Sequence, residues 1–300
     1  MQALKEHLRA IYKAFFQYRR GFLYLAMRYI VAPRILTHKA PLERPVTHQN
    51  LSMHMLFGAR DFLMALWSLA SFYHVSRVIG TLYLHSDGTL QERHIRTLQR
   101  LFPSAHVVDA KDILSTHKDF FITHPELEVF RRTYRKFQAK KLLDPYLSSS
   151  AEFRLILDSD MLWFMHPVEI EENLSSTSPR ALMMSDGDTD FAYVFFKDGT
   201  RISDTIASYN SGVTLYRKDQ FNLETLKEYL GRVDYTNSRF TDQACYATIL
   251  EPYLTMLPKD RYILKGSLDD TPRVMRHYTG PQRPKFYILG LDRLWKAILT

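Results

Sequence analysis

The chain has 300 residues, a formal net charge of +8 at pH 7 and a single cysteine. One cysteine excludes an internal disulfide framework, and 46% hydrophobic residues can form a large core, as one big domain or two small ones. The charge is uneven, because residues 1–40 carry eight basic side chains and one acid, which leaves the remaining 260 residues close to neutral. This distribution argues against nucleic acid as a partner of the main body and places the charge in an N-terminal arm.

The arm, with its linker, is predicted to cover residues 1–45. Its longest apolar run, 22–27, is far shorter than the ~20 residues that span a bilayer. A basic amphipathic helix can lie on an anionic membrane surface through residues 1–40, and the same stripe suits packing on the protein's own core or on a second copy in a homodimer. Prolines 33, 41 and 45 indicate a linker. The apolar stripe has helical spacings of three and four, and consists of Leu4, Leu8, Ile11, Phe15, Tyr18, Phe22, Leu25 and Tyr29.

Strand-like and helix-like segments then alternate through a single predicted domain, residues 46–300. This order predicts an α/β fold, with a mixed, mainly parallel sheet flanked by helices. The expected strands are 51–57, 78–84, 105–108, 153–157, 209–216 and 274–278. The expected helices are 61–73, 90–102, 126–147, 221–230 and 242–250.

Two acids one residue apart, Asp158 and Asp160, follow the apolar run 153–157. Carboxylates at the carboxyl end of a buried strand can hold a divalent cation in the crevice of an α/β sheet. A bound metal ion can then neutralise a diphosphate leaving group, which is chemistry suited to sugar transfer from a nucleotide. Two other Asp-x-Asp triplets, at 186–188 and 188–190, lie in a polar segment and are interpreted as a loop.

Two later segments carry polar groups next to regular elements. In Asn210-Ser-Gly212, a polar turn leads into a strand, where a glycine lets the backbone approach a ligand closely. Thr241 is the predicted N-cap of a helix, which places Asp242 and Gln243 in its first turn.

The segment 275–285 ends the series of candidate site residues. His277 closes a short strand and offers a nitrogen ligand that can complete an oxygen–nitrogen metal site with the two acids. Gly280 follows three residues later, and Arg283 and Lys285 are cations suited to phosphate oxygens. Glycine-rich fingerprints of dinucleotide-binding and P-loop proteins are missing from the sequence, as is a Gly-x-Ser-x-Gly elbow.

In this order the segments resemble glycosyltransferases of the GT-A fold, and most of all the retaining family 8, which includes glycogenin and bacterial lipopolysaccharide sugar transferases. The resemblance covers roughly residues 48–290. It implies a nucleotide-diphosphate sugar as donor and Mn²⁺ or Mg²⁺ as cofactor. By the same resemblance, the metal ligands are Asp158, Asp160 and His277; the sugar pocket contains Asn210, Gly212, Asp242 and Gln243; and the diphosphate contacts are Gly280 and Arg283.

The sequence departs from the family pattern at three places. Arg283 stands where the family's His-x-x-Gly-x-x-Lys motif has lysine, and Ala244 stands where an acid commonly follows the Asp-Gln pair. The first strand is followed by residues 58–61, Gly-Ala-Arg-Asp, in place of the usual acid-rich nucleotide contact. The missing acid leaves the retaining outcome open.

The sequence therefore predicts a metal-dependent glycosyltransferase, with Asp242 and Gln243 as catalytic residues and a glycan or glycolipid as acceptor. The expected location is cytoplasmic, or peripheral on the inner face of a membrane. One alternative is a nucleotidyltransferase or pyrophosphatase that uses the same metal and diphosphate contacts. Another is a catalytically inactive module that binds a membrane surface or RNA.

Overall fold

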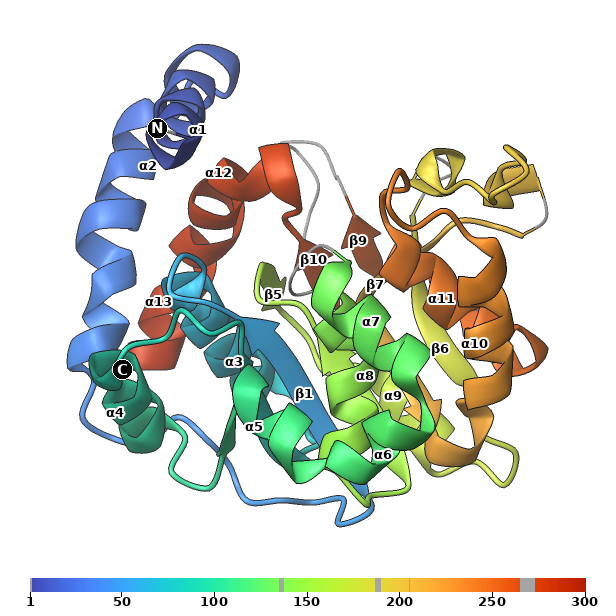
Figure 1. The fold of residues 1–300 in the computed structure, drawn as a ribbon. Helices are drawn as coiled ribbons and strands as arrows, with labels where there is room; N and C mark the ends of the chain where they lie inside the picture. Colours follow the sequence, from blue (N-terminus) through green and yellow to red (C-terminus); the bar gives the residue numbers. More distant parts are fainter. Residues whose placement is uncertain (1, 135–137, 187–189, 205, 265–272) are drawn as a thin grey trace.

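The computed structural model describes residues 2–134, 138–186, 190–204, 206–264 and 273–300. Its centre is a seven-stranded sheet in the order β3-β2-β1-β4-β7-β6-β8, with helices on both faces (Figure 1). The pairs β3–β2, β2–β1, β1–β4 and β6–β8 are parallel, whereas β7 is antiparallel to both of its neighbours. The predicted α/β fold with a mainly parallel sheet is confirmed. The strands are β1 Leu51–Phe57, β2 Thr81–Ser86, β3 His106–Asp109, β4 Phe153–Leu157, β6 Ala181–Ser185, β7 Tyr209–Arg217 and β8 Leu254–Met256.

A second, three-stranded sheet lies beside the carboxyl end of β4. Its order is β5-β10-β9, with β5 Met161–Trp163 antiparallel to β10 Met275–His277, and β9 Tyr262–Leu264 parallel to β10. Because three residues separate the end of β4 from the start of β5, the link between the two sheets is the segment 158–160. The pairing of β5 with β10 brings residue 277 opposite residue 161.

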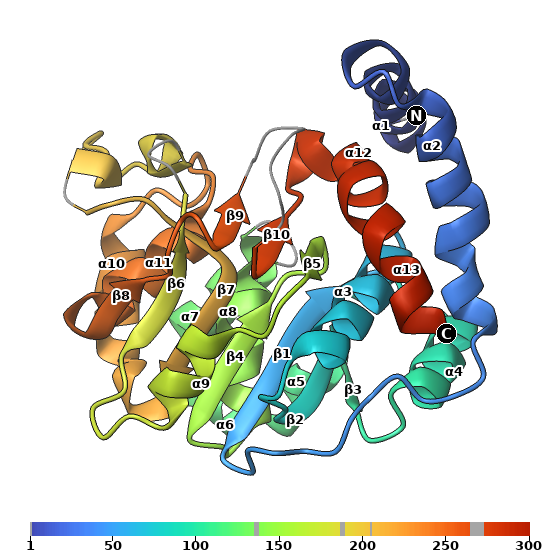
Figure 2. The same ribbon diagram turned by 180° about the vertical axis from the view of Figure 1, so that it is seen from behind.

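Helices cover both faces of the large sheet, as the two opposite views show (Figures 1 and 2). Alternate side chains of β4 divide between two cores, since Leu155 and Leu157 belong to one cluster and Ile156 to the other. A strand buried on both faces has a continuous run of apolar residues, which is why β4 could be predicted from the sequence. The helices are α1 Gln2–Tyr12, α2 Gly21–Ala26, α3 Phe62–Val75, α4 Glu92–Leu101, α5 Ala110–Thr116, α6 Lys118–Thr123, α7 Pro125–Thr133, α8 Gln138–Ser148, α9 Val168–Leu174, α10 Leu223–Arg232, α11 Thr241–Leu250, α12 Arg283–Lys285 and α13 Asp292–Leu299.

The predicted helix over 126–147 is two helices in the described residues. Helix α7 ends at Thr133, because Tyr134 takes an extended backbone conformation, and α8 begins at Gln138. The Tyr134 hydroxyl accepts a hydrogen bond from the backbone N–H of Thr241 at 2.8 Å. Tyr134 thus contacts the start of α11.

The basic N-terminal segment is helical, as predicted, but it forms a hairpin. Helix α1 and a π-helical turn, Lys13–Gln17, run to a reversal at Arg19, whose φ is 53°, and α2 then runs back beside them (Figure 1). A 2.8 Å contact between the Tyr29 hydroxyl and the His7 ring joins the two arms of the hairpin. The predicted single stripe is consequently divided between two helices.

The hairpin packs on the C-terminal helices. Tyr24 is fully buried and stacks edge-on against Tyr287, and the Trp67 indole N–H donates to the Ala32 carbonyl at 3.0 Å. Other large apolar side chains of the hairpin point outward, including Phe16 (71% exposed) and Phe22 (83% exposed). Within the described residues no helix is both long and apolar enough to cross a bilayer.

Candidate active site

The two acids lie at the junction between the sheets. Asp158 directly follows β4 and Asp160 directly precedes β5. Backbone hydrogen bonds hold this junction: the Asp158 N–H donates to the Gly212 carbonyl at 2.9 Å, and the Tyr278 N–H donates to the Asp160 carbonyl at 2.8 Å. Strands β7 and β10 therefore fix the position of both carboxylates.

The three predicted metal ligands converge. Asp158, Asp160 and His277 offer one ligand atom each, all within 4.8 Å of one another. The Nε2 atom of His277 is 2.9 Å from Asp160 Oδ1 and 3.5 Å from Asp158 Oδ2. Asp160 and His277 are buried and Asp158 is partly buried, so the group has one accessible side.

The orientation of His277 suits a metal ligand. Asn210 Oδ1 accepts the N–H of Gly212 at 2.9 Å, so it also accepts the Nδ1 proton of His277 at 3.1 Å. Nε2 then faces the two carboxylates, which is the orientation of an imidazole that shares a metal ion with them. Two carboxylates and an imidazole are a mixed oxygen–nitrogen set that fits a divalent transition metal ion.

Gly212 makes room for this imidazole. A Cβ atom at position 212 would lie 2.5 Å from Cε1 and Nδ1 of His277, closer than a real Cβ atom approaches. Only glycine allows strand β7 to pass so near the ring. The glycine in the Asn210-Ser-Gly212 turn is thus explained by close approach to the histidine.

Two cations flank the carboxylates. The Nζ atom of Lys141, on α8, lies 2.6 Å from Asp158 Oδ1 and 2.9 Å from the Ser211 hydroxyl. Arg283 bonds both Asp160, at 3.2 Å, and Asp61, at 2.6 Å. Burial alone would raise the pKa of Asp160, but the charges of His277 and Arg283 outweigh it and hold that pKa below its usual range.

The first turn of α11 lies beside the cluster. The Oε1 atom of Gln243 accepts from Asn210 Nδ2 at 2.9 Å and from the backbone N–H of Ser211 at 3.2 Å. Asp242 is buried and its Oδ1 atom has no hydrogen-bond partner. Burial raises the pKa of Asp242 to about 6; the Lys141 charge partly opposes the rise, and the Asp158 charge adds to it.

The predicted N-cap of α11 is wrong by one residue. Helix α11 begins at Thr241, and Phe240, with φ 58°, occupies the cap position without a side-chain cap bond. The Thr241 N–H is bonded to the Tyr134 hydroxyl instead, so a tertiary contact replaces the local cap. Asp242 and Gln243 still lie in the first turn, as predicted.

The remaining predicted residues lie around the loop after β10. Gly280 is exposed and has φ 43°, a conformation that favours glycine. The Lys285 ammonium lies 5.5 Å from the centre of the Tyr18 ring, on the N-terminal hairpin. Of the other acid triplets, Asp186 is buried at the end of β6, whereas Asp188 and the side chain of Asp190 lie outside the described residues.

A cavity of about 1490 Å³ opens beside the metal-ligand group. Asp158, Asp160 and His277 line one part of it, together with Gly280 and Arg283. The end of β1 and the start of α3 line another part, and the N-terminal hairpin closes a third side. The predicted metal ligands and the predicted diphosphate contacts Gly280 and Arg283 thus face one common space, whereas Lys285 is not among the residues that line it.

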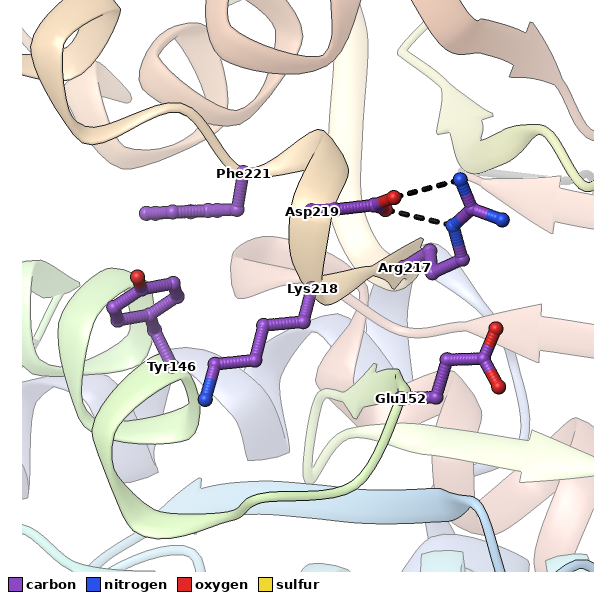
Figure 3. Close-up of a pocket in the computed structure, with 6 residues that line it drawn as sticks. All are labelled: Tyr146, Glu152, Arg217, Lys218, Asp219 and Phe221. Carbon is purple, nitrogen blue, oxygen red and sulfur yellow. Dashed lines mark hydrogen bonds and ion pairs between the residues drawn. The ribbon is translucent and has the colours of Figure 1, made fainter.

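A smaller cavity of about 510 Å³ lies where β4 begins and β7 ends (Figure 3). This is the opposite edge of the sheet, because β7 runs antiparallel to β4. Arg217 there bonds both carboxylate oxygens of Asp219 at 2.7 Å, and Lys218 lies over the Tyr146 ring. Its charged groups are paired with their neighbours, and the predicted site residues lie elsewhere.

Sequence reasoning missed two parts of this site. Lys141 sits in a charged helix segment, and nothing in its local pattern separates it from lysines that face solvent. Asp61 was noted only as part of the unusual end of the first strand. Its pairing with Arg283, 222 residues away, is a property of the folded chain.

Comparison with known proteins supports the fold. No protein-family model matches the sequence, and no curated protein sequence is significantly similar to it. Solved structures do match: WbbM, a bifunctional glycosyltransferase, has a TM-score of 0.59 at 14% identity, over 85% of this chain and 52% of that one. The chain thus spans about half the length of WbbM.

Two further matches cover most of the matched chain. Mouse xyloside xylosyltransferase 1 has a TM-score of 0.52 at 14% identity, over 76% of this chain and 97% of that one. The galactosyltransferase LgtC, solved with donor and acceptor sugar analogues, has a TM-score of 0.51 at 13% identity, over 77% and 87%. This chain has the GT-A glycosyltransferase fold that it shares with these proteins.

Proposed function

We propose that the chain is a metal-dependent glycosyltransferase that moves a sugar from a nucleotide-diphosphate sugar to a glycan or glycolipid acceptor. The observation that carries this proposal is the convergence of Asp158, Asp160 and His277 at one edge of a GT-A fold. Ligand atoms from two distant segments, the 158–160 link and the end of β10, meet within 4.8 Å beside a cavity large enough for a nucleotide sugar.

Asp158, Asp160 and His277 would hold the metal ion, and the imidazole nitrogen favours Mn²⁺ over Mg²⁺. When bound, the ion supplies positive charge that stabilises the departing diphosphate. Without the ion, Lys141 pairs with Asp158 and Arg283 pairs with Asp160, and these contacts orient the two carboxylates. Arg283 lines the cavity and can also donate to phosphate oxygens.

Asp242 and Gln243 would hold the transferred sugar. An unpartnered, buried oxygen of Asp242 is an acceptor suited to a sugar hydroxyl. Gln243 fixes the amide of Asn210, and Asn210 in turn orients His277. The sugar and metal sites would therefore share one hydrogen-bond network. We propose a retaining outcome, which the anomeric configuration of the product measured by NMR would test.

The N-terminal hairpin would attach the enzyme to an anionic membrane surface. Its outward side chains include Leu8, Tyr12, Phe16 and Phe22, and the basic residues Arg19 and Arg20 of the reversal are also exposed. An exposed apolar face next to cations is typical of peripheral binding. Sedimentation with anionic vesicles tests this, and a homodimer joined through the same face is the contrary result.

A thermal-shift screen of nucleotide sugars, with and without Mn²⁺, tests the proposed function. A donor at a hundred times its Kd should raise the free energy of unfolding by roughly 2.7 kcal/mol. The rise should need Mn²⁺ and should vanish in Asp160→Asn. A donor-induced shift of equal size without metal in both proteins would contradict a metal-dependent site.

A further inference from the structure

Part of the charged side of the N-terminal hairpin faces the protein. The partly buried side chains of Glu6, Lys13 and Arg28 line the same cavity as the metal-ligand group, and the exposed Arg9 also lines it. Tyr18 and Tyr24 are buried against the body, whereas Leu8, Tyr12 and Phe16 are exposed. A segment that served only as a membrane anchor would gain nothing from cations placed in a cavity.

Specific contacts hold the hairpin against the body. Glu6 pairs with Arg60 of the body, and Arg28 donates to the Tyr287 hydroxyl at 3.1 Å and lies over its ring. Arg20 donates to the Ile288 carbonyl at 3.4 Å. These contacts join the hairpin to the body at several points, so its inner face is a built wall of the cavity.

Positive charge is concentrated on this wall. Arg9 and Lys13 are four residues apart on one helical face, where like charges repel. Burial, and then the Arg9 charge, lower the pKa of Lys13. Arg93 of the body adds a further cation, whereas Arg60 is paired with Glu6, the acid that the hairpin contributes to the described lining. An anionic ligand would relieve this repulsion.

The cavity has room for more than one group. Ligand pockets commonly enclose about 300–1,000 Å³, and this cavity measures about 1490 Å³. If a diphosphate lies at the metal ligands, as in the proposed function, space remains along the hairpin wall. The two parts share a cavity but differ in chemistry, because one has paired carboxylates and the other has cations.

We propose that Arg9, Lys13 and Arg28 form a second phosphate-binding site, separate from the metal ligands. This inference rests on the proposed function. The shared chemistry is a phosphate group, which either the donor or a phosphorylated acceptor can bring. Arginine and lysine bind phosphate through charge-assisted hydrogen bonds, and several cations around one cavity suit a dianion.

The test uses the full chain and a matched pair of double variants. Arg9→Gln/Lys13→Gln removes two cavity cations, whereas Lys5→Gln/Lys39→Gln removes two exposed cations of the same arm that do not line the cavity. Both lose the same net charge and keep helix-forming side chains. Calorimetric titration at low ionic strength measures binding of Mn²⁺–pyrophosphate, and of glucose 1-phosphate without metal.

The two ligands separate the two sources of phosphate. If the wall binds donor phosphate, the cavity variant loses about tenfold in pyrophosphate affinity; if it binds an acceptor, the same loss appears with glucose 1-phosphate. The control variant should stay within about twofold of wild type for both. Equal losses in both variants, or no loss in the cavity variant, overturn the proposal.

Failure of the proposed function gives a different result. Wild type could fail to bind Mn²⁺–pyrophosphate but bind glucose 1-phosphate through Arg9 and Lys13. That result would contradict the proposed metal site and support the phosphate site on the hairpin. If wild type binds neither ligand, the wall proposal is overturned as well. A thermal unfolding curve for each variant shows that the fold is retained, and the single variants replace the double if it is not.

Discussion

The buried carboxylate of Asp242 should destabilise the folded protein at neutral pH, and Asp242→Asn should recover part of that stability. Burial raises the pKa of this carboxyl from 3.8 to about 6, and its Oδ1 atom has no partner. Each pKa unit corresponds to about 1.36 kcal/mol, so ionised Asp242 destabilises the fold by about 3 kcal/mol. We expect Asp242→Asn to recover on the order of 2 kcal/mol near neutral pH, because the amide keeps the shape and part of the hydrogen bonding.

The stability gain from Asp242→Asn should depend on pH. The folded-state pKa lies above the unfolded one, so the folded state binds the extra proton between the two values. Stability from this group is complete below about pH 4 and is lost as the pH rises through about 6. The gain from Asp242→Asn should thus be largest near pH 7.5 and fall to about half by pH 5.

Urea unfolding of wild type and Asp242→Asn at both pH values measures the effect. Glu172→Gln serves as a control, because it removes an exposed carboxylate on α9, outside the candidate site. A destabilised Asp242→Asn variant at neutral pH, or a gain that does not depend on pH, would refute the reasoning about burial. The same variant should lose transferase activity if Asp242 holds the sugar.

Three further predictions address the site and the hairpin. Gly212→Ala should push the His277 ring from its place and lower Mn²⁺ affinity about ten- to hundredfold, with unchanged circular dichroism. Arg283→Gln should weaken Mn²⁺–pyrophosphate binding about tenfold or more but change nucleoside affinity less than about twofold, and equal losses would show that Arg283 does not contact phosphate. Phe16→Ser/Phe22→Ser should lower binding to anionic vesicles by about tenfold or more, since each ring contributes roughly 1.5–3 kcal/mol on burial. A change in oligomeric mass with unaltered vesicle binding would instead identify an interface between copies.

The central strands could be predicted because burial on both faces leaves a plain signal. Strand β1 has the predicted bounds, and the acids at 158 and 160 stand where β4 ends. Parallel strands collect their carboxyl ends at one edge, so the ends of β1 and β4 had to lie near each other. The position of the two acids at this edge could therefore be predicted once 153–157 was assigned as a strand.

Other features depend on contacts that local patterns do not encode. The reversal at Arg19 divides an apolar stripe that looks continuous in sequence, and the hairpin folds because Tyr24 packs against Tyr287. The start of α11 is set by the distant Tyr134 hydroxyl rather than by a local cap. Such long-range partners decide the details of the site that propensity and spacing leave open.

The orientation of the hairpin's basic residues also depends on contacts that the local sequence pattern does not encode. The basic pattern of residues 1–40 suggested a surface that faces a membrane. In the folded chain, the partly buried Lys13 and the exposed Arg9 line the cavity next to the metal ligands, and Phe16 and Phe22 face solvent. The side of an amphipathic helix that packs on the protein depends on the side chains of the protein surface that it contacts.

The most direct measurement is the identity of the products formed from a nucleotide sugar in the presence of Mn²⁺. A glycosyltransferase releases a nucleoside diphosphate and transfers the sugar, or hydrolyses it slowly when no acceptor is present. We predict nucleoside diphosphate as the product in wild type, none after chelation of the metal, and none in folded Asp158→Asn. Release of pyrophosphate, or of nucleoside monophosphate with sugar phosphate, would instead identify a nucleotidyltransferase or pyrophosphatase and contradict sugar transfer.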